Sequence, residues 1–402
     1  MKVHIYPSRA AGTMRVPPSK SMAHRWLILA ALSGGSSVIR GVEDSEDLLA
    51  TMNCLKALGA LIRKEGSTVY LEGIRIREAK PLRELSCRES GSTLRFLLPA
   101  ALLCGQEVCL TGADSLLARP LEIYEQMCLE KGMSYRKEKG CIFIRGPLVS
   151  GTYSFPGNVS SQFATGLLMA LPQCQGDSLL KLLPPVESFP YIQMTLRTLE
   201  RSGIIIKETE PFTYRIPGGQ SYLPVDVTVE GDWSAAACFG ALNAAGGHVK
   251  LSGLEEDSAQ GDKIFETLIK TIEEGKAVID ISHIPDLGPI LAAVAALEKG
   301  AVLTGTARLA LKESHRGEAL AREIGKLGKQ ILMEENRILI PEGRLQAPRE
   351  ELEGHNDHRI VMALALMASV TGGTIRGAEA VNKSMPDFFE RLQQLGVKLT
   401  IE

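Results

Sequence analysis

Six segments of the chain are apolar on every face that a helix would present. They consist mainly of Ala, Leu, Ile, Val, Phe and Met, and they cover residues 26–32, 94–104, 163–171, 235–245, 290–297 and 360–370. Each segment ends at or near a glycine, which is the usual signal for a helix C-terminus. Because a helix that is apolar all round has no face for water, the pattern predicts six buried helices.

A short β-like run follows each of these segments and closes at a glycine or a turn. The runs cover residues 37–41, 108–112, 178–182, 248–253, 301–305 and 374–377, and they recur about every 67 residues. A loop and a second, more amphipathic helical segment follow each run. Six copies of such a unit predict an α/β protein of two domains with three repeats each, with the main boundary near residues 225–230.

The starts of the six apolar segments carry hydroxyl, carboxylate and amide side chains that could cap a helix. Capping does not explain the cations on the first turns, among them Lys20, Arg25, Arg95 and Arg359, because positive charge opposes the helix dipole there. An anion bound at the helix N-terminus would offset that cost. If the three helices of each domain point their N-termini one way, the sequence predicts an electropositive cleft for a small, multiply charged substrate.

Composition and charge exclude several other classes of protein. Lys and Arg number 45 against 47 Asp and Glu, a net charge of −2, and aromatic residues make up 5%. These values disfavour a nucleic-acid binder, which needs many phosphate-binding cations and often stacking aromatic rings. The longest apolar run is about half as long as a membrane span, and the N-terminal residues lack the apolar region of a signal peptide.

The eight cysteines form no CxxC pair and lie mostly in apolar runs. We therefore expect buried free thiols and a reducing, cytoplasmic setting. His355 and His358 are three residues apart without an evident third ligand, and the chain has no Walker A, GxGxxG or HExxH motif. We expect no metal site.

Nine short motifs occur in order along the chain. They are PSKSMAHR (18–25), SGSTLR (90–95), ARP (118–120), VSSQF (159–163), PY (190–191), IPD (284–286), LKESHR (311–316), NDHR (356–359) and NKSMPDF (382–388). One of them alone would be weak. Nine in this order make the chain resemble the 5-enolpyruvylshikimate-3-phosphate (EPSP) synthases, the enolpyruvyl transferase family of the shikimate pathway, over essentially its whole length.

This resemblance implies a fold of two domains, each with three βαβαββ units around buried parallel helices, an inside-out α/β barrel. Residues 14–225 would form one domain, residues 1–13 and 226–402 the other, and the active site would lie in the cleft between them.

The resemblance also implies the reaction and the partners. The family transfers the enolpyruvyl group of phosphoenolpyruvate to the 5-hydroxyl of shikimate 3-phosphate through a tetrahedral intermediate and releases phosphate. It uses no metal or cofactor. The expected partners are these two small molecules, without nucleic acid or membrane, and the expected form is a cytoplasmic monomer.

The binding residues follow by similarity. Phosphoenolpyruvate would be bound by Lys20, Gly91, Arg119, Gln162, Arg316, Arg359 and Lys383. Shikimate 3-phosphate would be bound by Lys20, Ser21, Arg25, Ser160, Ser161, Gln162, Ser188, Tyr191, Asp286 and Lys312. Both substrates carry a phosphate and a carboxylate, for which Arg and Lys are natural partners, and a glycine lets a ligand approach the backbone closely.

Addition to a carbon–carbon double bond needs a base for the hydroxyl and an acid for the methylene carbon. We assign Asp286 as the base and Glu313 as the acid, with Lys20 assisting proton transfer, and the reverse division stays open. The alternative role for Asp286 is a helix N-cap, and for Glu313 a surface carboxylate paired with neighbouring cations. The acidic stretch 43–47 is more typical of a solvated loop and helix cap than of a site.

Three other functions share parts of this pattern. The sister transferase that acts on UDP-N-acetylglucosamine has the same fold, but it typically carries Lys-Asn near its start and a reactive cysteine in a mobile loop. This chain has Lys20-Ser21 and no cysteine in residues 114–120. A catalytically silent anion-binding protein would not need both carboxyls. The related RNA-terminal cyclases would need a nucleotide-reactive histidine and a more basic surface.

Overall fold

The computed structural model describes residues 1–82, 84–138 and 140–402, and these residues form two compact units. Unit 1 comprises Met1–Pro17 and Gly231–Glu402, and unit 2 comprises Pro18–Glu230. These divisions lie a few residues beyond the expected ones at 13/14 and 225/226. The reason is strand pairing: β2 (Ala11–Arg15) pairs along its whole length with β15 (His248–Ser252) in unit 1, and β14 (Asp226–Thr228) pairs with β3 (Ser36–Arg40) in unit 2.

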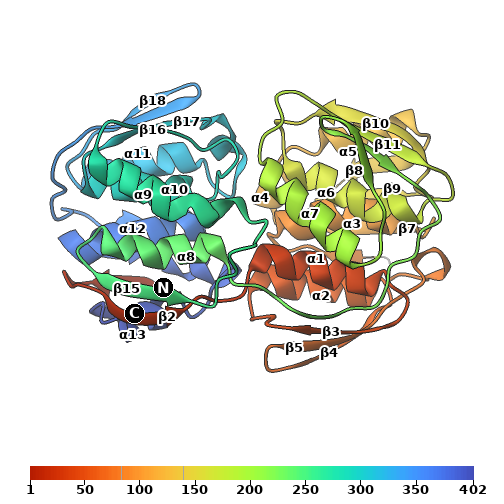
Figure 1. Cartoon of the computed structure of the whole chain (residues 1–402), viewed down its shortest axis with the longest axis horizontal. Helices are drawn as coiled ribbons and strands as arrows, with labels where there is room; N and C mark the ends of the chain where they lie inside the picture. The colour runs from red at the N-terminus through yellow and green to blue at the C-terminus, as the bar shows by residue number, and fades with distance from the viewer. Residues whose placement is uncertain (83, 139) are drawn as a thin grey trace. The chain divides into compact units, whose positions relative to one another are not determined.

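Unit 2 contains three copies of a βαβαββ pattern (Figure 1). The first copy comprises β14, α1 (Lys20–Ala31), β3, α2 (Glu46–Ala57), β4 (Leu61–Glu65) and β5 (Thr68–Glu72). The second comprises β6 (Glu84–Ser86), α3 (Gly91–Leu102), β7 (Glu107–Thr111), α5 (Glu122–Glu130), β8 (Ser134–Glu138) and β9 (Cys141–Arg145), with the short helix α4 (Asp114–Leu117) after β7. The third comprises β10 (Gly151–Pro156), α6 (Ser161–Ala170), β11 (Ser178–Leu183), α7 (Phe189–Arg201), β12 (Lys207–Glu210) and β13 (Thr213–Ile216).

The three sheets of unit 2 have the same topology. Their strand orders are β14-β3-β5-β4, β6-β7-β9-β8 and β10-β11-β13-β12. In each sheet the first two strands are parallel and the remaining pairs are antiparallel. A parallel pair needs a crossover connection, and the buried helix of each copy supplies it in the second and third sheets.

Unit 1 is built in the same way, with one departure. Its helices are α8 (Trp233–Gly240), α9 (Phe265–Glu274), α10 (Gly288–Leu297), α11 (Arg316–Lys326), α12 (His358–Thr371) and α13 (Phe388–Gln394). Its remaining strands are β1 (Lys2–Ile5), β16 (Ala277–Asp280), β17 (Ala301–Thr304), β18 (Leu332–Glu334), β19 (Arg337–Ile340), β20 (Leu352–Glu353), β21 (Gly373–Arg376) and β22 (Leu399–Ile401). The strand orders are β16-β17-β19-β18, β20-β21-β1-β22 and β15-β2, so one repeat has a two-stranded sheet instead of four strands.

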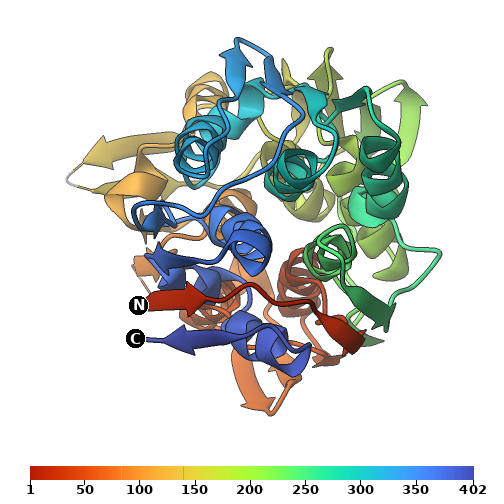
Figure 2. The same cartoon turned by 90° about the vertical axis from the view of Figure 1, so that its left-hand side faces the viewer.

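The N-terminal segment completes two sheets of unit 1. Strand β1 lies between β21 and β22 and is antiparallel to both, and β2 is parallel to β15. Figure 2 shows the two chain ends side by side on this sheet. Short 3₁₀ helices complete the description: η1 (Ile76–Glu78), η2 (Leu171–Gln173), η3 (Ala241–Asn243), η4 (Gly261–Ile264), η5 (Ala307–Leu311) and η6 (Ala378–Lys383).

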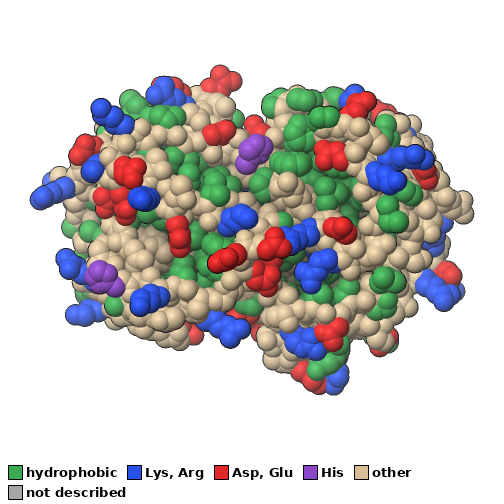
Figure 3. Space-filling view, in the orientation of Figure 1, with side chains coloured by type: hydrophobic (Ala, Val, Ile, Leu, Met, Phe, Trp, Pro, Cys, Tyr) green, Lys and Arg blue, Asp and Glu red, His purple; other side chains and the backbone are tan. Residues whose placement is uncertain are grey.

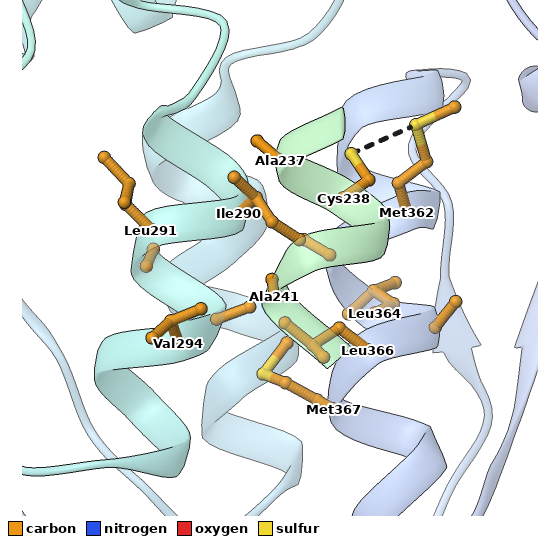
Figure 4. Packing of buried hydrophobic residues seen from close by; sticks show 14 of the residues in the cluster. Ala237, Cys238, Ala241, Ile290, Leu291, Val294, Met362, Leu364, Leu366 and Met367 are labelled. Atoms are coloured by element: carbon orange, nitrogen blue, oxygen red, sulfur yellow. Dashed lines mark hydrogen bonds between the residues drawn. The ribbon is translucent and has the colours of Figure 1, made fainter. Parts of the chain in front are cut away.

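The six predicted buried helices are confirmed as α1, α3 and α6 in unit 2 and α8, α10 and α12 in unit 1. In Figure 4, Ala237 of α8 and Ala241, the first residue of η3, lie among Ile290 of α10 and the apolar side chains of α12. Small side chains on α8 let the helices approach closely, which is how a dense interior is reached. The predicted α/β class, with helices inside and sheets outside, is confirmed.

All eight cysteines are free, and seven of them are buried. This agrees with the thiols expected from the sequence. On the face drawn in Figure 3, basic and acidic side chains are interspersed, in keeping with the net charge of −2. Among the residues described, none of the helices has the length and apolarity needed to cross a bilayer.

Candidate active site

Three helix N-termini of unit 2 carry the hydroxyl groups that the sequence singled out. The Ser19 hydroxyl accepts from the Met22 N–H at the start of α1, and Ser90 caps α3 in the same way. Ser160 caps α6, accepting from the N–H of Gln162 at 3.3 Å. These caps satisfy part of each helix start and leave the first-turn cations to be explained.

Four cations, Lys20, Arg25, Arg95 and Arg119, form what we call the cationic cluster of unit 2. Arg95 Nη1 donates to Gln162 Oε1 at 2.8 Å, and Gln162 Nε2 donates to Ser92 Oγ at 3.0 Å, so the starts of α3 and α6 meet. A Cβ placed on Gly91 would lie 3.1 Å from Arg119 Nη1. The structure therefore brings Gly91, Arg119 and Gln162 together.

Arg25 is a buried member of this cluster. Its guanidinium donates to Thr195 Oγ1 at 3.0 Å, to the Ser21 carbonyl at 2.8 Å and to the Tyr191 carbonyl at 2.8 Å. Burial lowers the pKa of Arg25 to about 10, against a smaller opposing effect of Tyr191. Three of the five N–H donors of this arginine are thus used, and two of them hold the backbone of Ser21 and Tyr191, both predicted as binding residues.

Lys20 has a partner that the sequence analysis missed. Its Nζ lies 2.7 Å from Asp47 Oδ2, and Asp47 is buried on the first turn of α2. The interpretation of residues 43–47 as a solvated loop and cap is therefore wrong for Asp47. It is right for Ser45, which caps α2, and for Glu46, which is exposed. The local pattern could not reveal the pairing, because it joins two different helices.

A chain of buried hydroxyl groups connects the same helices. His24 Nδ1 lies 2.8 Å from Thr51 Oγ1, Thr51 lies 2.6 Å from Thr93 Oγ1, and Thr93 donates to Ser90 Oγ at 2.7 Å. Burial, together with the charges of Lys20 and Arg25, lowers the pKa of His24 well below its usual value, so the imidazole is neutral. This series of hydrogen bonds fixes the start of α3 relative to α1 and α2.

Asp286, immediately before α10, is the centre of an ion-pair cluster in unit 1. Its carboxylate lies 3.2 Å from Lys312 Nζ, 2.9 Å from Arg316 Nη1 and 3.7 Å from Arg359 Nη2. Burial opposes its ionisation, but the charges of Lys312, Arg359 and Arg316 outweigh it and hold the pKa of Asp286 well below its usual range. The N-cap residue of α10 is Leu287, so capping is not the role of Asp286.

Asp357 is a second buried carboxylate of this cluster. It accepts from Arg316 Nε at 2.8 Å, from the Ser314 hydroxyl at 3.1 Å and from the Arg359 N–H at 2.9 Å, which makes it the N-cap of α12. Burial opposes its ionisation and the Arg316 charge favours it, and the pKa of Asp357 is lowered. The sequence analysis quoted the NDHR motif but gave a role only to Arg359.

Glu313 is only 15% exposed and faces His358 and Lys383, which come from later parts of the chain. Its Oε2 lies 3.0 Å from His358 Nδ1 and 3.9 Å from Lys383 Nζ. Lys383 also donates to the Asn356 carbonyl at 2.6 Å. The alternative of a surface carboxylate is therefore disfavoured, and His358 is a further site residue that the sequence analysis missed. The signal that could have found it is its place in the NDHR motif.

Burial also changes the lysine of this cluster. Loss of hydration lowers the pKa of Lys312 to about 8, with Arg316 and Arg308 acting in the same direction and Asp286 opposing them. The charged form of Lys312 is therefore stabilised by an anion close to it, such as the Asp286 carboxylate.

Glu313, Asp357 and His358 also have ligand atoms within 4.8 Å of one another, a spacing that a metal ion could use. Arg316 and Lys383 already face two of these side chains, and a divalent cation would be repelled by both. The other histidine of the expected pair, His355, bonds to Glu323 instead, with its Nε2 2.9 Å from Glu323 Oε1.

Comparison with known proteins gives one consistent result. Residues 6–392 match the family profile described as EPSP synthase (3-phosphoshikimate 1-carboxyvinyltransferase). A 3-phosphoshikimate 1-carboxyvinyltransferase of Clostridium kluyveri is 38% identical over 421 residues, covering 98% of this chain and 97% of that protein. One from Clostridium perfringens SM101 is 38% identical, with 98% of both chains covered.

Solved structures show the same fold. The EPSP synthase of Acinetobacter baumannii superposes with a TM-score of 0.81 at 24% identity, covering 100% of this chain and 99% of that one. The enolpyruvyl transferase NikO of Streptomyces tendae superposes with a TM-score of 0.79 at 18% identity, covering 99% and 98%.

Proposed function

Because this chain belongs to the EPSP synthase family, we propose that the cationic cluster of unit 2 and the ion-pair cluster of unit 1 act on one pair of substrates. The chain transfers the enolpyruvyl group of phosphoenolpyruvate to shikimate 3-phosphate, a step of aromatic biosynthesis. The proposal concerns which side chains do this. The observation that carries it is the concentration of buried and partly buried cations around Asp286 and Gly91, because both substrates are multiply charged anions.

Phosphoenolpyruvate is bound, in this proposal, by side chains of both units. Unit 2 supplies Lys20, Gly91, Arg119 and Gln162, and unit 1 supplies Arg316, Arg359 and Lys383. The contact between Gly91 and the Arg119 guanidinium supports the first group. The placement of Arg316 and Arg359 beside Asp286 supports the second, since buried guanidinium groups suit bidentate recognition of carboxylate and phosphate.

Shikimate 3-phosphate is bound by hydroxyl and cationic groups, mainly from the helix starts of unit 2. They are Lys20, Ser21, Arg25, Ser160, Ser161, Gln162, Ser188 and Tyr191, with Asp286 and Lys312 from unit 1. The bonds from Arg25 to the Ser21 and Tyr191 carbonyls support this grouping. Ser188 sits at the start of α7 with a φ of 53°, a backbone conformation that is costly for serine and is often found at binding sites.

The chemical step uses Asp286 as the base for the 5-hydroxyl of shikimate 3-phosphate and Glu313 as the acid for the methylene carbon, with Lys20 assisting. A tetrahedral intermediate forms, and it then releases phosphate as its methyl group returns a proton to Glu313, which restores the double bond. A carboxylate with a very low pKa is a weak base. Bound substrate anions would neutralise the cations that hold the pKa of Asp286 down, and its basicity would rise when both substrates are present.

The acid role of Glu313 is supported by its contacts with His358 and Lys383, either of which could return a proton to it.

We also propose that the enzyme works as a monomer in the cytoplasm, without metal or cofactor. The seven buried free thiols support a reducing compartment.

A phosphate-release assay tests the function directly. Phosphate should appear when shikimate 3-phosphate and phosphoenolpyruvate are both present and should not appear when either is omitted. Release with UDP-N-acetylglucosamine in place of shikimate 3-phosphate would identify the sister activity. Binding of both anions without release would identify a catalytically silent protein.

Asp47→Asn should lower kcat/KM by up to about 100-fold, because a misplacement of about 1 Å at a reacting group can cost that much. The asparagine keeps the shape of Asp47 but removes the charge that holds Lys20 Nζ at 2.7 Å. Steady-state kinetics provide the measurement. Glu46→Gln, which removes an exposed carboxylate from the same helical turn, is the matched control. Unchanged kinetics in Asp47→Asn would mean that Lys20 is held without it.

Gly91→Ala should raise the KM for phosphoenolpyruvate and leave the KM for shikimate 3-phosphate nearly unchanged. The new methyl group would lie 3.1 Å from Arg119 Nη1, closer than ordinary van der Waals contact, and would displace this guanidinium. Initial rates measured with each substrate varied in turn provide the check. A change in the KM for shikimate 3-phosphate alone would contradict the place given to Gly91.

A further inference from the structure

The two residues that precede Asp357, the N-cap of α12, have a costly backbone conformation. His355 and Asn356 both have φ of 51°, in the left-handed region that side chains other than glycine rarely adopt. Residues held in this region cost roughly 1 kcal/mol or more each and persist only where neighbouring structure fixes them. Asp357, His358 and Arg359 follow directly, so the conformation of this turn sets where three site residues begin.

A buried carboxylate on another helix holds the turn. Glu323 of α11 has no exposed side-chain surface, and its Oε1 lies 2.9 Å from His355 Nε2. Its Oε2 accepts from the Glu353 N–H at 2.9 Å and lies 2.9 Å from Lys326 Nζ. Burial opposes ionisation, but these partners outweigh it and lower the pKa of Glu323, so it is charged at neutral pH.

The turn is also fixed at its two ends. The Gly354 N–H donates to the Arg376 carbonyl at 2.8 Å, and a Cβ on Gly354 would lie 2.7 Å from the Gly377 carbonyl oxygen. Lys383 Nζ donates to the Asn356 carbonyl at 2.6 Å. Between these two ends, the bond between His355 and Glu323 restrains the middle of the turn.

We propose that Glu323 and His355 are positioning residues of the enzyme, which hold residues 355–356 in the left-handed conformation and so aim Asp357, His358 and Arg359. This inference rests on the proposed function of Arg359 and Glu313. A rotation in the turn would move Arg359 away from Asp286 and His358 away from Glu313, so both proposed catalytic carboxyls would lose a neighbour. Glu323 itself touches neither substrate in this scheme.

A series at position 355 separates backbone conformation from imidazole chemistry. His355→Asn and His355→Gly should retain most activity, because both residues tolerate a positive φ. His355→Val should raise the KM for phosphoenolpyruvate by about tenfold or more, because a β-branched residue strongly disfavours this conformation. Equal losses in all three variants would overturn the proposal, since they would show that the imidazole is required for something other than the conformation of the turn.

Glu323→Gln tests the other partner. It keeps the acceptor for the Glu353 N–H and removes the charge that faces His355. We expect a rise of roughly three- to tenfold in the KM for phosphoenolpyruvate, with a smaller change in kcat. Glu318→Gln, at an exposed carboxylate of the same helix, is the control. A lower melting temperature with both KM values unchanged would show a merely structural role and would overturn the proposal.

The same kinetics distinguish failure of the inference from failure of the proposed function. If Glu323→Gln and His355→Val raise the KM for shikimate 3-phosphate instead, the positioning role stands and the assignment of Arg359 to phosphoenolpyruvate is wrong. If Glu323→Gln does not fold, the His355 series still decides the proposal.

Discussion

Asp286→Asn and Glu313→Gln should each lower kcat by about 10²- to 10⁴-fold, the usual contribution of a general acid or base. Both substitutions keep the shape of the side chain. Asp286→Asn removes the charge that three cations share, and Glu313→Gln removes the group that faces His358 and Lys383. Single-turnover measurements of phosphate release, at saturating concentrations of both substrates, separate this effect from binding.

The control for this pair is Glu335→Gln, which removes an exposed carboxylate of the same unit. Its kcat should equal that of the unmodified enzyme. Near-normal turnover in both Asp286→Asn and Glu313→Gln would remove the acid–base assignment. A loss in only one of them would leave that residue as the single proton-transfer group and return the other to a binding role.

Arg316→Gln should lower the free energy of unfolding by about 3–5 kcal/mol at neutral pH, because it leaves the buried Asp357 carboxylate without its ion-pair partner. The Arg316 side chain is only 3% exposed, and it bridges Asp286 and Asp357. Urea denaturation gives the measurement. Arg322→Gln, at an exposed position of the same helix, should change stability by less than about 0.5 kcal/mol.

Lowering the pH should reduce the difference in the free energy of unfolding between Arg316→Gln and the unmodified protein. The pKa of Asp357 is lowered by Arg316 against the effect of burial, so the pair stabilises the fold above the unfolded pKa of about 4. That stabilisation is lost as pH falls through the lower folded pKa. Without Arg316, burial raises the pKa of Asp357 instead, so this carboxyl is protonated at a higher pH. Protonation removes the free-energy penalty of burying its unpaired charge. If the free energies of unfolding of the two proteins differed by the same amount at pH 7 and at pH 4, this account would be contradicted.

Local sequence patterns predicted the buried helices and their starts, because apolarity and capping are properties of consecutive residues. The α8 segment shows the limit of that method: residues 235–245 were expected to be one helix, and the structure has α8 to Gly240 followed by the 3₁₀ helix Ala241–Asn243. The sequence signal there is an apolar run, which does not distinguish the two helix types.

Contacts between distant residues could not be predicted in this way. Lys20 and Asp47 are 27 residues apart on different helices, and Glu323 and His355 are 32 apart. From the local sequence alone, Lys20, Asp47 and Glu323 would be interpreted as surface charges, and His355 as a histidine in a loop. The left-handed turn at His355 has no signal either, since glycine, the residue that usually marks such a conformation, is absent from both positions.

Strand β1 has a consequence for how the protein folds as it is synthesised. It pairs with β21 and β22, so residues near the start of the chain wait for partners as late as Leu399–Ile401. Unit 2 is contiguous from Pro18 to Glu230 and can fold while the remainder is still being made. Limited proteolysis of ribosome-bound nascent chains should show Pro18–Glu230 becoming resistant first, while Lys2–Ile5 stay cleavable until Leu399–Ile401 have emerged. The last repeat to be translated therefore determines when the first residues of the chain become part of the fold.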